Sequence, residues 1–350
     1  MRWTAPKLKV LDAAEAGRFP DPVLRAGIAL RLRSKVAEES RGGVEALAAR
    51  KRALLDDRAA GPVTTHVLDA NRQHYEVPSA FFLRILGPRL RYSCCFWPDE
   101  VGDLAAAEEA ALAQTVERAR IADGERVLEL GAGWGSLSLY LAERFPSSEI
   151  VTVSNSRTQK LHIDAAATTK GLTNLTVHTA DIGSFAPEGT FDRVVSVEMF
   201  EHVRNHRELL RRISTWLNPG GTCFVHVFSH LSVAWHFDAA EDNDWMARYF
   251  FAGGTMPSDD LLLHEQRDLA VVEHWNLDGT HYAKTLQAWL DRLDADRDGC
   301  LAALATGEDP AAPELQLSRW RLFLLSSIGT WAMAGGTEFG VSHYLFARRS

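Results

Sequence analysis

The sequence predicts an α/β fold with a mostly parallel, doubly wound sheet, an N-terminal helical extension and an inserted helical and aromatic cap. Between residues 104 and 230, short apolar runs alternate with helical segments, and a glycine-rich turn follows the first run. Residues 8–60 space their apolar positions three and four apart, which is typical of helices. Strands that alternate with helices indicate a parallel sheet with helices on its faces.

The order of the core elements follows from these runs. Helices are expected at 104–121, 136–145, 156–171 and 206–217, and strands at 125–130, 149–155, 175–181, 193–200 and 221–230. The chain then becomes aromatic and irregular and ends in an alternating segment, 338–348, which we expect to form an antiparallel edge of the sheet. We divide the chain into an extension (1–100), a core (101–230), a cap and insertion (231–335) and a terminal core strand (336–350).

Composition and charge argue against several classes of function. The net charge is −8; residues 1–60 hold 13 Lys and Arg against 8 Asp and Glu, a balance of +5, which leaves −13 for the rest. This main domain lacks the basic patch of a nucleic-acid binder, and the charges of the extension indicate a solvated helix face. No apolar run approaches the ~20 residues of a spanning helix, and the N-terminus lacks a signal peptide's apolar stretch. We expect a cytoplasmic protein without stable membrane insertion and leave open whether it forms a homodimer.

The turn after the first core strand predicts a site where the backbone approaches a ligand. It reads Gly131-Ala132-Gly133-Trp134-Gly135, directly after Glu129. Glycines allow a close approach and a tight entry into a helix. The spacing GxGxG differs from the dinucleotide pattern GxGxxG, because position 136 is Ser. On its own the turn also fits a purely structural role.

Polar residues after the next two strands raise the specificity of this pattern. Asn155 follows the second strand, about 20 residues after the glycines, where doubly wound folds place a side chain against a ribose. Asp181 follows the third strand and could accept a hydrogen bond from an adenine amino group. Taken singly, Asp181 could cap a turn and Asn155 could cap a helix. Their order at successive strand ends favours a cofactor site.

At this point the sequence resembles a known family. The segments GAGWGSLSLYLA, VTVSNSRTQK, TADI and VEMFEH are similar to the cyclopropane-fatty-acyl-phospholipid synthase superfamily of methyltransferases. The segments YSCCFWPDE, VEMFEHVRN, DWMARYFFAGGTMPS and HWNLDGTHYAKTLQAWL resemble the plant-type coclaurine N-methyltransferases within it. The resemblance runs from about residue 20 to the C-terminus. It implies a Rossmann-like class I methyltransferase, with a cofactor lid in the extension and an acceptor-binding cap.

The resemblance implies S-adenosyl-L-methionine as cofactor and a small-molecule amine as acceptor. Its cofactor-binding positions correspond here to Tyr92, Ser93, Gly131, Gly133, Asn155, Gln159, Asp181, Ile182 and Val197. Three positions depart from the lipid-modifying branch, which has Gly where this chain has Glu198, a bicarbonate-holding His near Asn276 and a Cys at about Ser327. The plant N-methyltransferases carry Glu at position 198, which favours an amine acceptor.

Glu198, Glu201 and His202 are the candidate catalytic residues. Their i, i+3, i+4 spacing would put them on one face if the segment begins a helix. Carboxylates can hold an ammonium group, and His202 can take its proton because imidazole titrates near neutral pH. We assign proton removal to Glu201 with His202, and orientation of the amine to Glu198. The competing interpretation is a helix start with acids at its positive end. A metal site is not expected, because the segment lacks a second nearby His.

Aromatic residues of the cap are candidates for the acceptor pocket, since aromatic faces attract cations. They are Trp235, Phe237, Tyr249, Phe250, Tyr282 and Trp331. Such clusters are more often plain core, so we expect only a minority to touch substrate. Two other functions stay open at this stage: carbon methylation or cyclopropanation of an unsaturated acyl chain, and a cofactor-binding module without catalysis.

Overall fold

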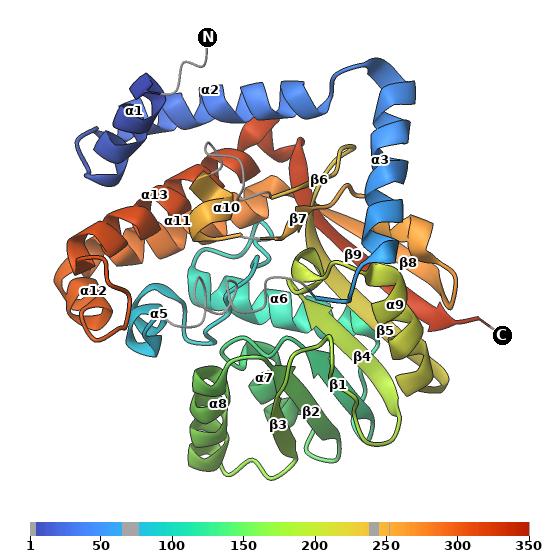
Figure 1. Ribbon diagram of the computed structural model, residues 1–350. Coiled ribbons are helices and arrows are strands. Elements are labelled where there is room, and N and C mark those ends of the chain that lie inside the picture. The colour runs from blue at the N-terminus through green and yellow to red at the C-terminus, as the bar shows by residue number, and fades with distance from the viewer. Residues whose placement is uncertain (1–4, 65–76, 238–244, 252, 350) are drawn as a thin grey trace.

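A computed structural model describes residues 5–64, 77–237, 245–251 and 253–349 (Figure 1). Its centre is a seven-stranded sheet with the order β3-β2-β1-β4-β5-β9-β8. β1 pairs in parallel with β2 and β4, and β5 pairs antiparallel with β9. The predicted α/β class and the doubly wound sheet are therefore confirmed. The strands are β1 (Arg126–Leu130), β2 (Glu149–Ser154), β3 (Leu175–Thr179), β4 (Phe191–Val197), β5 (Leu217–His230), β8 (Leu269–Asp278) and β9 (Phe339–Arg348), with β6 (Trp235–His236) and β7 (Thr255–Met256) in a separate two-stranded sheet.

The terminal strand does not form the edge of the sheet, so that prediction is wrong. β9 lies between β5 and β8, and β8 is the edge. β8 was not predicted because most of its side chains are half-buried or exposed, and Glu273, His274 and Asn276 interrupt its apolar positions. An edge strand with one solvated face carries such mixed residues. As a result, part of the expected cap, 269–278, belongs to the core sheet.

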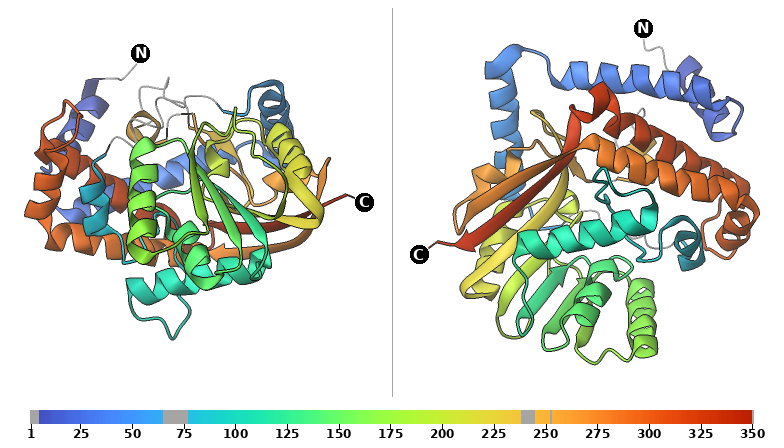
Figure 2. Two further views of the ribbon diagram at one scale, coloured as in Figure 1. Left: turned by 90° about the horizontal axis from the view of Figure 1, so that it is seen from below. Right: turned by 180° about the vertical axis from the view of Figure 1, so that it is seen from behind.

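The two faces of the sheet are covered by different helices. α6, α7 and α8 pack on one face, and α9 packs on the other (Figure 2). Side chains cap three of these helices: Asp103 caps α6, Ser156 caps α8 and Asn205 caps α9, each accepting a hydrogen bond from a backbone N–H three residues on. These helices are α6 (Leu104–Ala119), α7 (Ser136–Arg144), α8 (Arg157–Lys170) and α9 (His206–Trp216).

The remaining helices build a second layer over the carboxyl ends of the parallel strands. α2 runs along the outside of α13, and α3 descends past α9 toward the sheet (Figure 1). Ion pairs fasten the extension, with Arg321 contacting Asp21 at 2.6 Å and Arg319 contacting Glu15 at 2.9 Å. None of the described helices is long and apolar enough to cross a membrane. The helices are α1 (Ala5–Glu15), α2 (Asp21–Glu39), α3 (Gly43–Ala60), α5 (Ser79–Ile85), α10 (Trp245–Tyr249), α11 (Gly279–Ala295), α12 (Arg297–Leu304) and α13 (Pro313–Trp331).

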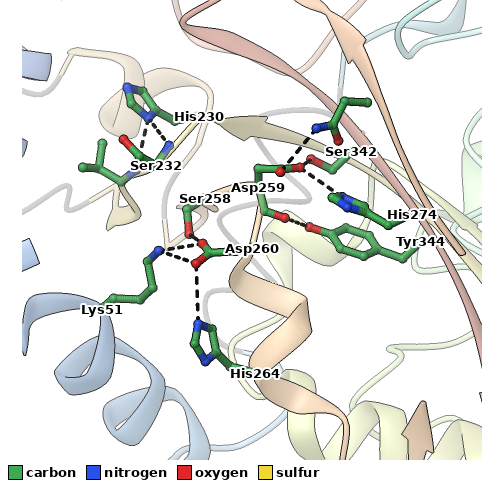
Figure 3. Close-up of polar contacts among 12 residues, drawn as sticks. Lys51, His230, Ser232, Ser258, Asp259, Asp260, His264, His274, Ser342 and Tyr344 are labelled. Atoms are coloured by element: carbon green, nitrogen blue, oxygen red, sulfur yellow. Dashed lines mark hydrogen bonds and ion pairs between the residues drawn. The ribbon is translucent and has the colours of Figure 1, made fainter. Parts of the chain in front are cut away.

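A polar cluster ties α3 and the loop after β7 to the antiparallel strands (Figure 3). Asp259 accepts hydrogen bonds from His274 of β8 at 3.0 Å and from Ser342 of β9 at 2.6 Å. Its neighbour Asp260 accepts from Lys51 of α3, also at 2.6 Å. The hydrogen-bonding partners keep the pKa of both carboxyl groups below its usual range despite their partial burial. The cluster therefore orients the second layer relative to the sheet.

Candidate active site

One large cavity of about 1380 Å³ opens at the carboxyl ends of β1, β2 and β4. Doubly wound sheets bind ligands at this edge. The glycine turn and the ends of β2 and β3 form one part of its wall, and aromatic side chains of the second layer form another. Helix α2 contributes side chains such as Leu24, Ile28 and Lys35. Helix α2 has the solvated face that was expected of the extension, and its other side lines the cavity.

The glycine turn has the backbone that its sequence predicts. Gly131 has φ 94° and Gly135 has φ 83°, values that favour glycine. A Cβ on Gly135 would lie 2.7 Å from Ile163, so this position also needs the space. A Cβ on Gly131 would lie 3.1 Å from Met199. Gly131 and Gly133 both line the cavity, as expected.

Polar side chains surround the turn. Asn155, Gln159, Asp181 and Ile182 line the cavity, together with Tyr92, Ser93 and Val197. Asn155 does not cap α8, because Ser156 does. Asp181 accepts hydrogen bonds from Gly183 N–H at 2.9 Å and from the Thr64 hydroxyl at 3.1 Å, so it fixes a local turn and also faces the cavity. Among the described residues, the buried Ser136 hydroxyl beside the turn has no hydrogen-bond partner.

Glu198 is held in a strained and well-defined position. Its φ of 46° is rare for a residue with a side chain, and such strain often occurs at functional sites. One carboxylate oxygen accepts from Cys94 N–H at 2.8 Å and faces His226 Nε2 at 3.2 Å. The other accepts from the Tyr282 hydroxyl at 2.5 Å. Burial raises the pKa of Glu198 to about 7, against these hydrogen bonds.

Glu201 and His202 complete the acidic segment. Glu201 is 2% exposed, and burial together with Glu198 raises its pKa well above the usual range. Its Oε2 has no hydrogen-bond partner among the described residues. The His202 ring stacks on Phe251 with an interplanar angle of 3°. All three side chains line the cavity.

The predicted helical face in this segment is wrong, although the residues converge. Only Phe200–His202 is helical, as a single 3₁₀ turn, and Glu198 precedes it in a left-handed conformation. The chain bends here because β4 ends at Val197 and α9 begins only at His206. The bend, and not α-helical spacing, brings Glu198, Glu201 and His202 to the cavity.

Four of the six predicted aromatic residues line the cavity: Trp235, Phe237, Tyr282 and Trp331. Tyr249 and Phe250 lie outside its lining. The Phe250 ring stacks on Phe323 with centroids 4.3 Å apart, and the Tyr249 hydroxyl accepts a hydrogen bond from Arg319. Tyr282 also contacts Glu198, a role that its sequence context did not indicate.

Comparisons with known proteins agree with this geometry. Residues 63–327 match the family model of mycolic acid cyclopropane synthetase. The chain is 34% identical to the (S)-coclaurine N-methyltransferase of Thalictrum flavum subsp. glaucum, over 99% of both chains. The chain belongs to the mycolic acid cyclopropane synthetase family, as a coclaurine N-methyltransferase-like member. It is an S-adenosylmethionine-dependent methyltransferase.

Solved structures of the family support the same conclusion. A crystal structure of coclaurine N-methyltransferase bound to N-methylheliamine and SAH has a TM-score of 0.93 and 32% identity, covering 98% of this chain and 100% of that chain. The cyclopropane synthase MmaA2 of Mycobacterium tuberculosis has a TM-score of 0.69 at 21% identity, covering 81% and 99% of the two chains, which shows the shared fold. The cyclopropane-fatty-acyl-phospholipid synthase of Escherichia coli K12 is 30% identical over 63% of this chain and 56% of its own.

The residues around the glycine turn fit the family's cofactor. S-adenosylmethionine offers an amino acid, a ribose and an adenine. The turn and the unpartnered Ser136 hydroxyl suit the amino acid, Asn155 and Gln159 offer polar groups for the ribose, and Asp181 offers an acceptor for the adenine amino group. The donors and acceptors are therefore of the right kind.

Two positions that the sequence analysis set apart from the lipid-modifying branch differ in their relation to the cavity. Asn276, compared in the sequence with that branch's bicarbonate-holding His, lies on β8 outside the cavity lining, where it donates a hydrogen bond to Asp259. Ser327 of α13 does line the cavity. His226, which the sequence analysis missed, is the histidine that contacts Glu198. Every residue from Gly221 to His230 is buried on β5, so no alternation of polar and apolar residues singled it out.

Proposed function

We propose that this enzyme methylates the nitrogen of a small cyclic or aromatic-bearing amine, such as a tetrahydroisoquinoline. The observation that carries the proposal is the place of segment 198–202 between the two parts of the cavity. Its Met199 packs against the glycine turn at Gly131, and its His202 stacks on Phe251 in the aromatic part. Ionisable groups therefore lie where a cofactor and an aromatic acceptor would meet.

The reaction sets three requirements for the protein. An alkylamine is mostly protonated at neutral pH, and its nitrogen then has no lone pair. The site must hold the cation, remove one proton and keep nitrogen, methyl carbon and sulfur in line. When bound, S-adenosylmethionine supplies the methyl group.

Glu198 suits the first requirement. Its carboxylate is held by the Cys94 N–H and the Tyr282 hydroxyl, so it can orient an ammonium group without moving. A pKa near 7 is also consistent with this use, because an approaching cation favours the charged form of a buried acid. We assign orientation of the amine to Glu198.

We assign proton removal to Glu201 and His202. His202 offers an imidazole nitrogen that can accept a proton, as a general base must. Glu201 is its neighbour in the chain and is buried beside Glu198, so it can stabilise the positive charge that the proton brings. Trp235, Phe237 and Trp331 would exclude water and attract the amine cation through their ring faces.

The test is a direct comparison of acceptors. The purified enzyme is incubated with labelled S-adenosylmethionine and either an amine panel or an unsaturated phospholipid, and the products are identified by mass. The proposal predicts a methylated amine, with tetrahydroisoquinolines among the best acceptors. Turnover of phospholipid without turnover of any amine would favour cyclopropanation or carbon methylation instead. The cytoplasmic location and the question of a homodimer stay predictions from the sequence.

A further inference from the structure

A row of hydrogen-bonded side chains runs from Glu198 along one face of the sheet toward its β8 edge. Glu198 Oε1 lies 3.2 Å from His226 Nε2, His226 Nδ1 lies 2.9 Å from His343 Nε2, and His343 Nδ1 lies 2.7 Å from the Arg118 guanidinium. His226 and His343 are directly opposite residues on β5 and β9, so their side chains share one face. α6, which carries Arg118, covers that face (Figure 2).

The far end of the row reaches a second, polar surface pocket of about 260 Å³. Arg118 lines this pocket with Trp275, Arg120 and Glu273. Its guanidinium lies over the Trp275 ring, 5.2 Å from the centroid, and Trp275 is the residue of β8 opposite His343. The pairing of β5, β9 and β8 and the position of α6 therefore align these side chains. The row begins at the active-site cavity and ends near solvent.

Arg118 gives the row a direction. A guanidinium has only donors and keeps its charge, so His343 Nδ1 must be the acceptor and Nε2 must carry the proton. His343 then donates to His226 Nδ1, and His226 must also carry its proton on Nε2. That proton points at Glu198 Oε1. Each hydrogen bond along the row thus depends on the one before it.

We propose that Arg118 and His343 are positioning residues for methyl transfer, which act by fixing the tautomer of His226 so that it donates to the Glu198 carboxylate. The proposal rests on the proposed role of Glu198 in holding the amine. A proton relay to solvent is a different role and does not fit this row, because Arg118 cannot accept a proton. Both histidines are at most 2% exposed, and burial holds their pKa well below the usual range, so they work as neutral imidazoles.

Removal of Arg118, the donor at the end of the row, would allow His343 and His226 to adopt the other tautomer. Without Arg118, His343 could carry its proton on Nδ1, and His226 could donate to it and turn a bare Nε2 toward Glu198. Two acceptors would then face each other unless Glu198 takes a proton, so the pKa of Glu198 would rise. The other charged or titratable groups that influence Glu198 and His343 would stay in place; they are Arg91, Cys94, Glu201, His274 and Tyr282.

The test uses two pairs of variants. Arg118→Met keeps the aliphatic stem of a half-buried residue and removes the donor, and Arg120→Met removes an exposed arginine of the same pocket that pairs with Glu273. His343→Leu breaks the row while keeping Arg118. His343→Gln keeps the row, because the glutamine carbonyl can accept a hydrogen bond from Arg118 and the glutamine amide can donate one to His226. Histidine ¹⁵N NMR reads the tautomers without substrate, and the pH profile of kcat/KM for an amine reads Glu198.

The proposal predicts Nε2–H tautomers for His226 and His343 in the wild type. Arg118→Met and His343→Leu should change the His226 tautomer and move the acidic limb of the profile upward by about one pH unit, since a hydrogen bond to a charged group is worth roughly that much. Arg120→Met and His343→Gln should leave the limb in place. Wild-type tautomers and an unmoved limb in Arg118→Met would overturn the proposal. If the tautomers change but no variant or wild type methylates an amine, the proposed function fails instead.

Discussion

The two parts of the cavity are built in opposite ways. Around the glycine turn, the backbone makes the site; Asn155 and Asp181 follow β2 and β3, and Gln159 lies in the first turn of α8. In segment 198–202, buried acids stand close together, with Glu198 in a left-handed conformation and Glu201 Oε2 without a hydrogen-bond partner in the described chain. The first part is complementary to a neutral ribose and adenine, whereas the second is complementary to a cation.

The largest expected effect comes from Glu201→Gln, which removes the ionisable carboxyl group at nearly constant shape. Turnover should fall by about 10²–10⁴-fold, the usual contribution of general acid–base groups. Cofactor affinity should stay unchanged, because we assign cofactor binding to the glycine turn and its neighbours. Glu208→Gln, on the exposed side of α9 where the acid pairs with Arg211, is the matched control and should keep full turnover. Equal losses in cofactor affinity and turnover would show that the two parts are not separate.

Asp181→Ala addresses the other part. Loss of one or two hydrogen bonds to a carboxylate should weaken binding of the demethylated cofactor roughly 10–100-fold, measured by calorimetry. Turnover at saturating cofactor should change little, since within the described residues the side-chain hydrogen bonds of Asp181 join it to Thr64 and Gly183 and not to segment 198–202. The variant also loses the hydrogen bonds from Thr64 and Gly183, so its melting temperature is the control for a local rearrangement.

The sequence predicts the part of the cavity around the glycine turn better than the part around segment 198–202. The glycine turn and the polar strand ends are local features, and short apolar strands beside them are easily recognised. The burial of Glu198 and the direction of its pKa shift are not local features. They depend on Cys94, His226 and Tyr282, which lie far apart in the chain and meet only in the fold.

The aromatic residues show the same limit. The sequence indicates that 245–251 carries rings, yet whether Phe250 or Phe251 faces the cavity depends on how the chain turns after α10 ends at Tyr249. The sequence also placed the edge of the sheet wrongly, because β8 is half-exposed and its apolar positions are interrupted by charge. Side-chain direction and the solvated edge strand were thus the parts that sequence patterns could not resolve.

Glu198→Gln tests whether the strained acid costs stability. The folded protein raises the pKa of Glu198 from 4.5 to about 7, so between these values it binds more protons than the unfolded chain. The stability that protonation provides is present below the unfolded pKa and is lost as the pH rises through the folded pKa. At about pH 8 the variant should therefore gain roughly 1–3 kcal/mol over the wild type, and far less at about pH 5.

The same substitution should raise the acceptor KM about tenfold, because a carboxylate–ammonium pair is lost. Denaturant unfolding at the two pH values measures the stability difference, and initial rates measure KM. An equal stability change at both pH values would mean that Glu198 titrates normally in the fold.

The smallest effect on activity distinguishes an aromatic residue in the cavity from one outside it. Phe237→Ala should raise the acceptor KM several-fold, about 1 kcal/mol for a lost cation–aromatic contact, with a modest loss of stability. Phe250→Ala should leave KM unchanged while costing about 3–5 kcal/mol of unfolding free energy, because Phe250 is packed against Phe323. Steady-state kinetics and denaturant unfolding of both variants separate the two roles, and a KM effect in Phe250→Ala would contradict the assignment.

The central claim is that His202 removes a proton from the amine while the cofactor part of the site works independently. The most direct measurement is the pH dependence of turnover for the wild type and His202→Ala, using two amines of different pKa so that the titration of the acceptor can be separated from that of the enzyme. We predict that wild-type turnover rises with pH and that His202→Ala loses this rise with both amines. The variant should also lose about 10²–10⁴-fold in turnover at neutral pH and keep its cofactor affinity. A folded His202→Ala protein with wild-type turnover at neutral pH would contradict the claim and leave a carboxylate or water as the base.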